Sequence, residues 1–151
     1  MLIKSFIEKE HKLKLIETKI LMQKELLPLR LQAYERLALY LERISPNVML
    51  INQHEQGLTV QEFQQRLLET VRQEFEHNFS QQIYVSAAAW TITRNAKEEV
   101  ARLINVAADS LDAEAPSYQL SKKVFDMMLE REDFPTQRAL SIVKAEVAQL
   151  F

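Results

Sequence analysis

Residues 27–46 read LPLRLQAYERLALYLERISP, and this stretch decides the fold. Its apolar residues recur at intervals of three and four positions, which places them on one face of a helix. They also extend around more than half of the helix, and this predicts burial on two sides. Either the rest of the chain surrounds this helix, or a second subunit covers it.

The same pattern begins near Leu2 and continues to Ile44. Pro28 lies inside it, where proline lacks an N–H and its ring clashes with the preceding turn. The sequence therefore predicts either one long, kinked helix or two stacked helices that break near Leu27. The helix should end at Ser45, because a residue before proline avoids the α region.

The composition excludes several fold classes, because the 151 residues include one glycine and no cysteine. Glycine reaches positive φ without steric cost, and tight hairpins and phosphate-binding loops need that freedom. With Gly57 alone, a hairpin-rich β-fold, a P-loop and a dinucleotide-binding turn are excluded. The lack of cysteine excludes disulfides, thiolate metal sites and cysteine nucleophiles. A soluble helical domain remains, and the length fits a single domain.

The rest of the chain also reads as helices. Residues 45–58 are expected to form the main loop, and Thr59 with Glu62 fits a capping box that opens a helix to about Phe79. An extended connector at 83–85 precedes a helix capped by Ser86. Further helices are predicted over about 117–132 and from Pro135.

The predicted fold is all-α, an antiparallel bundle of four to five helices with a long first helix. Its core should contain the apolar stripes Phe63, Leu67, Val71, Phe75 and Phe79; Trp90, Thr93, Val100, Leu103, Ala107 and Leu111; Leu120, Val124, Phe125, Met128 and Leu129; and Ala139, Ile142, Val143, Val147 and Leu150.

Charge divides the chain unevenly. The formal net charge is −2, yet residues 1–30 carry seven basic and four acidic side chains. We expect one helical domain over 1–151, with a basic N-terminal helical arm at 1–26 and a bundle body at 27–151. The arm could bind an anionic surface, either lipid or nucleic acid, through Lys4, Lys9, Lys12, Lys14 and Lys19. Nucleic acid is the less favoured partner, because glutamates interleave with these lysines and the whole chain is acidic.

A di-iron site is the first chemical possibility, since Glu-x-x-His occurs at Glu8–His11 and at Glu74–His77. Di-iron bundles use two such pairs with two further glutamates, all facing the core. At about 100° per residue, His77 turns away from the apolar stripe of its helix. Glu8 and His11 lie in a strongly charged run that favours solvent. Both pairs are therefore rejected as metal ligands.

No other residue group predicts catalysis. The serines at predicted helix starts are explained by capping, and none lies in a nucleophile elbow. His54 occupies a polar loop whose composition accounts for it without a catalytic role. We assign no catalytic residue, no enzyme activity and no cofactor.

The arginines and tyrosines of the first helix form a candidate interaction surface. Both residue types are enriched at interface hot spots. An arginine one turn from a tyrosine is also a common contact within one helix, so a purely structural role is the more ordinary explanation of the pattern. The candidates are Arg30, Tyr34, Arg36, Tyr40 and Arg43.

Residues 27–46, the stretch from Gln81 to Ser86 with Trp90, and the end from Val147 to Phe151 resemble a family of uncharacterised bacterial proteins. The resemblance implies an N-terminal membrane helix followed by a cytoplasmic helical domain, and no catalytic activity. This chain lacks the membrane helix, so Met1 to Lys9 would form the membrane-proximal edge. The basic arm fits that expectation, because lysine and arginine concentrate on the cytoplasmic flank of membrane helices.

Three function classes follow. The first is a non-enzymatic helical interaction or scaffold module, pairing with itself as a homodimer through the first helix or with another protein. The second is a binder of anionic surfaces through the arm. The third, a di-iron carboxylate bundle, is remote. The expected location is cytoplasmic, or the inner face of a membrane if an anchor precedes residue 1.

Overall fold

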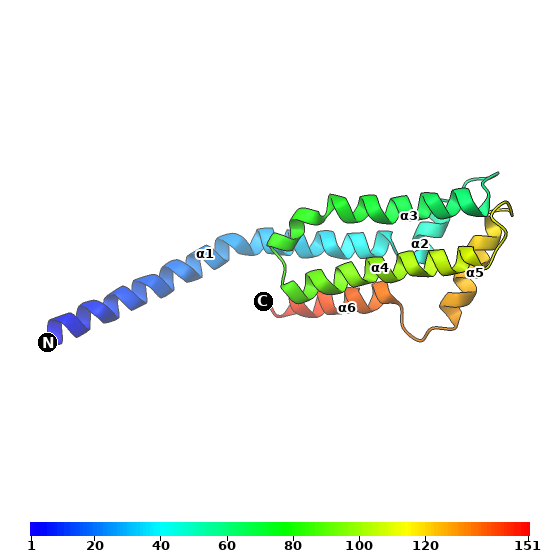
Figure 1. The fold of residues 1–151 in the computed structure, drawn as a ribbon. Coiled ribbons are helices and arrows are strands. Elements are labelled where there is room, and N and C mark those ends of the chain that lie inside the picture. The colour runs from blue at the N-terminus through cyan, green and yellow to red at the C-terminus, as the bar shows by residue number, and fades with distance from the viewer.

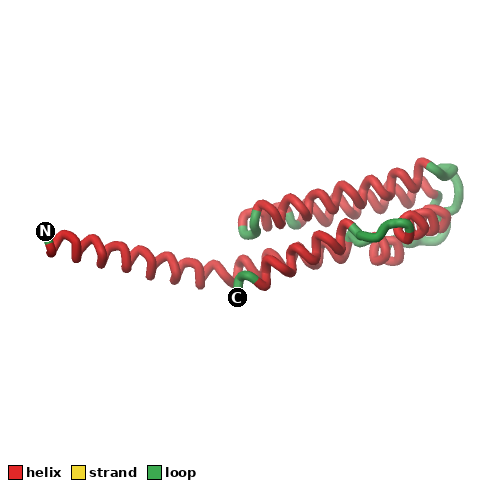
Figure 2. Tube along the Cα trace, turned by 90° about the horizontal axis from the view of Figure 1, so that it is seen from below, coloured by secondary structure: helices red, strands yellow, loops and turns green.

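The computed structural model describes residues 1–151 and contains helices joined by loops. The α-helices are α1 (Leu2–Arg43), α2 (Pro46–Asn52), α3 (Val60–His77), α4 (Ala87–Asp109), α5 (Tyr118–Leu129) and α6 (Pro135–Ala148), and a 3-10 helix, η1, spans Phe79–Ile83. Figure 2 shows the chain as helix and loop throughout, with no strand. The prediction of an all-α fold with a long first helix is confirmed.

Four helices lie side by side along the length of the body (Figure 1). The second half of α1 and α4 run in one direction, whereas α3 and α6 run in the other, as predicted for an antiparallel bundle. α4 packs on α3, α5 and α6, and α1 packs on α6. α2 and α5 close the end of the body far from the N-terminus.

α1 continues unbroken through Pro28, so the alternative of two stacked helices is wrong. Proline removes only one hydrogen bond, and Pro28 is exposed, so its ring needs no space in the core. The helix changes direction as it leaves the body, and a bend at an internal proline is the usual response of a long helix (Figure 1).

The junctions between helices differ from two of the predictions. Residues 45–58 are not a simple loop, because α2 begins with Pro46 at its first turn and buries Met49 and Leu50. The prediction of an extended connector at 83–85 is also wrong, since η1 continues to Ile83.

Two helix starts follow the predictions. The Thr59–Glu62 capping box is formed in both directions. The Ser86 hydroxyl accepts a hydrogen bond of 2.9 Å from the Ala89 N–H.

The core is one cluster drawn from every α-helix. Phe75 lies at its aromatic centre, stacked on Trp90 at 5.3 Å between ring centroids and tilted against Tyr40 at 6.0 Å. Three residues predicted for the core are exposed: Phe79, Phe125 and Leu129. Phe79 lies beyond the end of α3. Phe125 and Leu129 are on α5, which closes the end of the bundle and is therefore covered by other helices on a single side.

Candidate interaction surface

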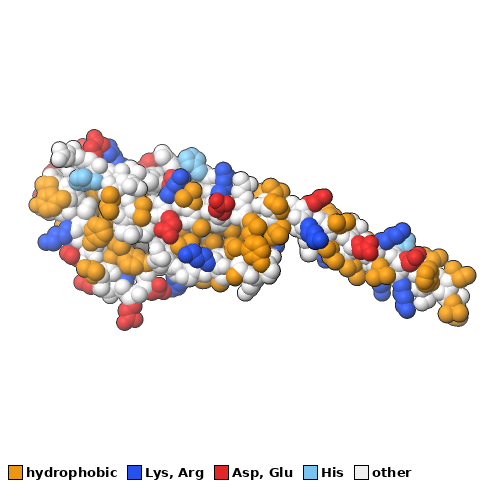
Figure 3. Space-filling view, turned by 180° about the vertical axis from the view of Figure 1, so that it is seen from behind, with side chains coloured by type: hydrophobic (Ala, Val, Ile, Leu, Met, Phe, Trp, Pro, Cys, Tyr) orange, Lys and Arg blue, Asp and Glu red, His pale blue; other side chains and the backbone are white.

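The arm, residues 1–26, projects from the body as a single helix (Figure 1). Every one of its residues is exposed. It carries twelve of the chain's 22 exposed large hydrophobic side chains, and Figure 3 shows apolar side chains along its length. Monomeric proteins rarely expose a continuous apolar surface of this extent, so the arm is the strongest interaction candidate in the molecule.

One apolar row on α1 repeats at intervals of seven residues. Its members are Phe6, Leu13, Ile20, Leu27, Tyr34 and Leu41. A seven-residue apolar interval is the signature of helices that pack against one another as coiled coils. We call these six residues the heptad row.

Half of the heptad row is core and half is bare. Tyr34 and Leu41 are buried and Leu27 is half-buried, whereas Phe6, Leu13 and Ile20 are 63%, 60% and 48% exposed. The row therefore begins as an uncovered stripe and becomes part of the bundle core without changing its spacing.

α6 covers the row inside the body and stops at the root of the arm. A cavity of about 380 Å³ marks this point. Gln149 and Leu150, which follow α6, line one side of it, and the other side is lined by α1 residues from Ile20 to Arg30, Leu27 among them. Beyond Leu27 toward the N-terminus, no helix of this chain takes the place of α6 (Figure 1).

Leu2 and Ile16 flank the heptad row at the second core position of a heptad, and Lys9 and Gln23 occupy the same position in the other two repeats. The seam from Leu2 to Leu27 is thus apolar at six of eight core positions. A shorter row at the same interval lies on another side of α1 and consists of Leu15, Met22 and Leu29. The heptad row is the longer of the two and the one that becomes buried core.

Two of the predicted interaction residues are inside the body, which corrects the prediction for Tyr34 and Tyr40. Tyr34 is 2% exposed, and its hydroxyl donates a hydrogen bond of 2.8 Å to Glu146. Tyr40 is 1% exposed, and its hydroxyl has no hydrogen-bond partner. Burial raises the pKa of Tyr40 well above its usual range, and the nearby carboxylates of Glu74 and Glu98 raise it further. The bundle itself surrounds this half of α1, so these tyrosines are unavailable to a partner.

The three arginines of the predicted surface lie in different settings. Arg30 is half-buried, and its Nε–H donates a hydrogen bond of 3.2 Å to the Tyr84 carbonyl oxygen. Arg43 pairs with Glu74 at 3.4 Å, and Arg36 is exposed. The structure does not bring the five predicted residues together as one patch.

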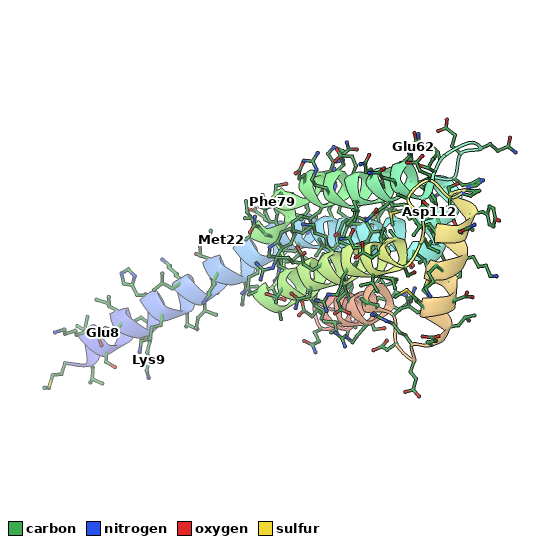
Figure 4. The ribbon with its side chains drawn as sticks, turned by 45° about the vertical axis from the view of Figure 1, so that its right-hand side comes forward. Glu8, Lys9, Met22, Glu62, Phe79 and Asp112 are labelled. Carbon is green, nitrogen blue, oxygen red and sulfur yellow. The ribbon has the colours of Figure 1, made fainter.

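The lysines predicted to bind an anionic surface are all exposed on the arm, Lys9 near its free end (Figure 4). Lys4, Lys9 and Lys14 follow one another at five-residue intervals, which turns each about 140° from the last. Lys12 and Lys19 lie between Lys4 and Lys9 around the helix, so these four lysines fall within an arc of about 140°, whereas Lys14 lies on another side.

The rejected metal candidates lie far apart in the fold. Glu8 is near the free end of the arm (Figure 4), and His11 is one turn further along, both exposed. His77 is exposed at the end of α3, and Glu74 is engaged by Arg43. No three histidine, aspartate or glutamate side chains come together as a potential metal site.

His54 lies beside a cavity of about 310 Å³ between α2 and α5, lined by apolar Leu50, Ile51 and Phe125 with Tyr118 and Ser121. Its ring meets the edge of Phe63 at 6.3 Å between centroids. No carboxylate lines this cavity. Glu114 lines a second cavity beside His54, of about 420 Å³, but no hydrogen bond joins its carboxylate to the imidazole to orient it as a base.

The apolar periodicity of residues 2–44 contains every residue of the heptad row, but the sequence-based prediction places the interaction surface on the arginines and tyrosines instead. The surface is identified by the seven-residue interval together with the position on α1 beyond which no other helix covers the row.

Comparison with known proteins gives one match. The model of a "Family of unknown function (DUF7935)" matches residues 1–150. No curated protein and no solved structure matches the chain. The resemblance to an uncharacterised family is therefore confirmed, whereas bacterial origin and a membrane anchor stay predictions. None of the helices has both the length and the apolar character required to cross a membrane.

Proposed function

The chain belongs to DUF7935, a family of unknown function, and we propose that it is a non-enzymatic interaction module that self-associates through its arm. The observation that carries the proposal is the heptad row, which is buried by α6 inside the body and bare along the arm. A partner that covers apolar surface stabilises the complex by about 25 cal/mol for each Å² removed from water.

The length of the arm supports a helical partner. Residues 2–27 span about 38 Å at 1.5 Å per residue. An isolated helix of this length is marginal in water, because most helical stability in proteins comes from the packing of an apolar face. A second helix along the row would provide that packing.

Analytical ultracentrifugation of the full chain tests the proposal. We expect a dimer that dissociates on dilution, and conversion to monomer by Leu13→Glu or Ile20→Glu in the bare part of the row. Leu129→Glu is the matched control, because Leu129 is 86% exposed on α5, outside the arm, and its replacement should leave the association unchanged. A wild-type chain that stays monomeric at high micromolar concentration would contradict the proposal.

The same variants check that loss of association is not loss of fold. All three positions are exposed, so the thermal unfolding midpoint of the body should be unchanged in each variant after the dimer contribution is removed by dilution. A variant that dissociates the dimer and also unfolds the body would not count as support.

A further inference from the structure

The charges that flank the heptad row indicate how two arms would lie. In heptad terms Phe6, Leu13 and Ile20 occupy position a, and the seam is flanked by positions e and g. Lys12 and Lys19 are at g, and Glu10 and Glu17 are at e. All four side chains are exposed and none forms an ion pair within the chain. They are therefore free to meet charges on a partner.

Two copies in parallel alignment would pair opposite charges at two contacts and like charges at three. In a parallel coiled coil, position g faces position e of the next heptad in the other helix. Lys12 of each copy then faces Glu17 of the other, which forms two attractive pairs. Lys19 faces Lys24, which forms two repulsive pairs, and Lys9 meets its own counterpart at a core position.

Two fully overlapped antiparallel copies would pair only like charges. In that arrangement e faces e and g faces g. Glu10 of each copy would face Glu17 of the other, and Lys12 would face Lys19. This arrangement has four repulsive contacts and no attractive pair, whereas the parallel pair has two attractive contacts against three repulsive ones, so the antiparallel alignment is the more disfavoured of the two.

We therefore infer that the partner of the arm is a second copy of this chain, aligned parallel and in register from Leu2 to Leu27. This inference rests on the self-association proposed above and adds its orientation. α6 limits the pairing, because Tyr34 of the row is hydrogen-bonded to Glu146 of α6, and a partner helix that slid into the body would meet α6 there. The two α1 helices must then separate at Leu27, next to Pro28, and a proline inside a helix favours a bend there. The two bodies would lie at the same end of the paired arms.

Charge reversal distinguishes the two orientations. In the parallel pair, Lys12→Glu turns two attractive contacts into two repulsive ones, and Glu17→Lys does the same. Each should weaken dimerisation roughly tenfold at low ionic strength, and the double variant should restore it. In the antiparallel pair, each single variant would place opposite charges together and tighten the dimer. Sedimentation equilibrium at low and high salt measures the change, which salt should suppress.

A single introduced thiol tests the alignment directly, because the chain has no cysteine. In the parallel pair, residue 2 of each copy lies beside its counterpart, within the 4.4–6.8 Å between Cα atoms that a disulfide allows. In the antiparallel pair about 37 Å would separate them. Leu2→Cys should therefore form a covalent dimer in a glutathione redox buffer. Lys4→Cys, on the opposite side of the helix, is the control and should not.

The outcomes separate the two proposals. Tighter dimers from both single charge reversals, or no cross-link through Leu2→Cys in a chain that does dimerise, overturn the parallel alignment and leave self-association standing. A monomeric wild-type chain overturns both. A parallel trimer or tetramer overturns the two-stranded pairing but keeps the parallel alignment, because all three states use the same two core positions of the heptad.

Discussion

The Tyr34 hydroxyl donates a hydrogen bond of 2.8 Å to Oε2 of Glu146, across 112 residues of sequence. The same carboxylate accepts a hydrogen bond from the Ser86 hydroxyl, whose oxygen lies 2.7 Å from Oε2. The Ser86 N–H in turn donates to the Tyr34 hydroxyl at 3.1 Å. These contacts join α1, the start of α4 and the end of α6 about two helical turns inside the body from Leu27, where the covered and bare halves of α1 meet.

Tyr34→Phe should destabilise the body by about 1–3 kcal/mol, because it leaves the Ser86 N–H and part of the Glu146 carboxylate without a partner in a partly buried site. Urea unfolding followed by circular dichroism measures the change. Tyr118→Phe is the control, since Tyr118 is 60% exposed. Equal effects of the two substitutions would show that the Tyr34 hydrogen bonds add nothing.

Tyr40→Phe should not destabilise the body in the way that Tyr34→Phe does, although Tyr40 is buried on the same helix. Its hydroxyl has no hydrogen-bond partner, so its removal should be neutral or stabilising. Urea unfolding at pH 7 is the measurement, and a loss of 2 kcal/mol or more would point to a partner for this hydroxyl, such as a bound water.

The pKa of Tyr40 adds a pH dependence to the same variant. Because burial raises this pKa in the folded chain, the unfolded chain loses the tyrosine proton first as the pH rises above about 10. The folded state then binds more protons than the unfolded state, so stability is retained below pH 10 and falls above it. Tyr40→Phe should make the decline between pH 9 and pH 11 shallower, and an unchanged slope would contradict this assignment.

Phe75→Ala should cost about 3–5 kcal/mol, because it removes a buried ring that contacts both Tyr40 and Trp90. Leu129→Ala should stay within about 0.5 kcal/mol, since Leu129 is exposed. Denaturant unfolding of both variants compares them. A cost below 1 kcal/mol for Phe75→Ala would mean that this part of the core is poorly packed.

Thr59→Ala should destabilise the body by about 1 kcal/mol through loss of the capping box at α3, in which the Thr59 hydroxyl accepts from the Glu62 N–H at 3.2 Å. Thr59→Ser keeps the acceptor oxygen and should retain most of the stability. Thermal unfolding of the wild type and the two variants is the measurement. Equal unfolding midpoints for Thr59→Ala and Thr59→Ser would show that the side-chain cap does not stabilise the body.

His77→Ala should change stability by less than about 0.5 kcal/mol, because His77 is exposed at the end of α3. Calorimetry of the wild type and the variant, each with and without added Fe²⁺, is the measurement. A midpoint that rises with iron only in the wild type would reopen the metal site.

Most of the local structure follows from residue patterns that act over short distances. The Thr59–Glu62 box, Ser86 at the start of α4 and Pro135 at the start of α6 are all predicted from the sequence and found in the structure, because caps depend on neighbours three residues away. α2 escapes prediction because seven residues are too few for a clear period. Phe125 and Leu129 are assigned wrongly because periodicity reports a face of α5 and not whether another helix covers it.

The sequence by itself determined that residues 2–44 are helical with an apolar row at seven-residue intervals, because backbone geometry alone fixes which residues share a face. The structure decided that Pro28 does not divide this segment into two helices. The tertiary structure decided where that row is covered. Tyr34 is hydrogen-bonded to Glu146 of α6 and Leu41 is buried in the core, whereas Leu13 and Ile20 are exposed. The spacing is the same on both sides of Leu27, so periodicity cannot distinguish core from surface. That distinction depends on where α6 ends, which is a property of the packed bundle.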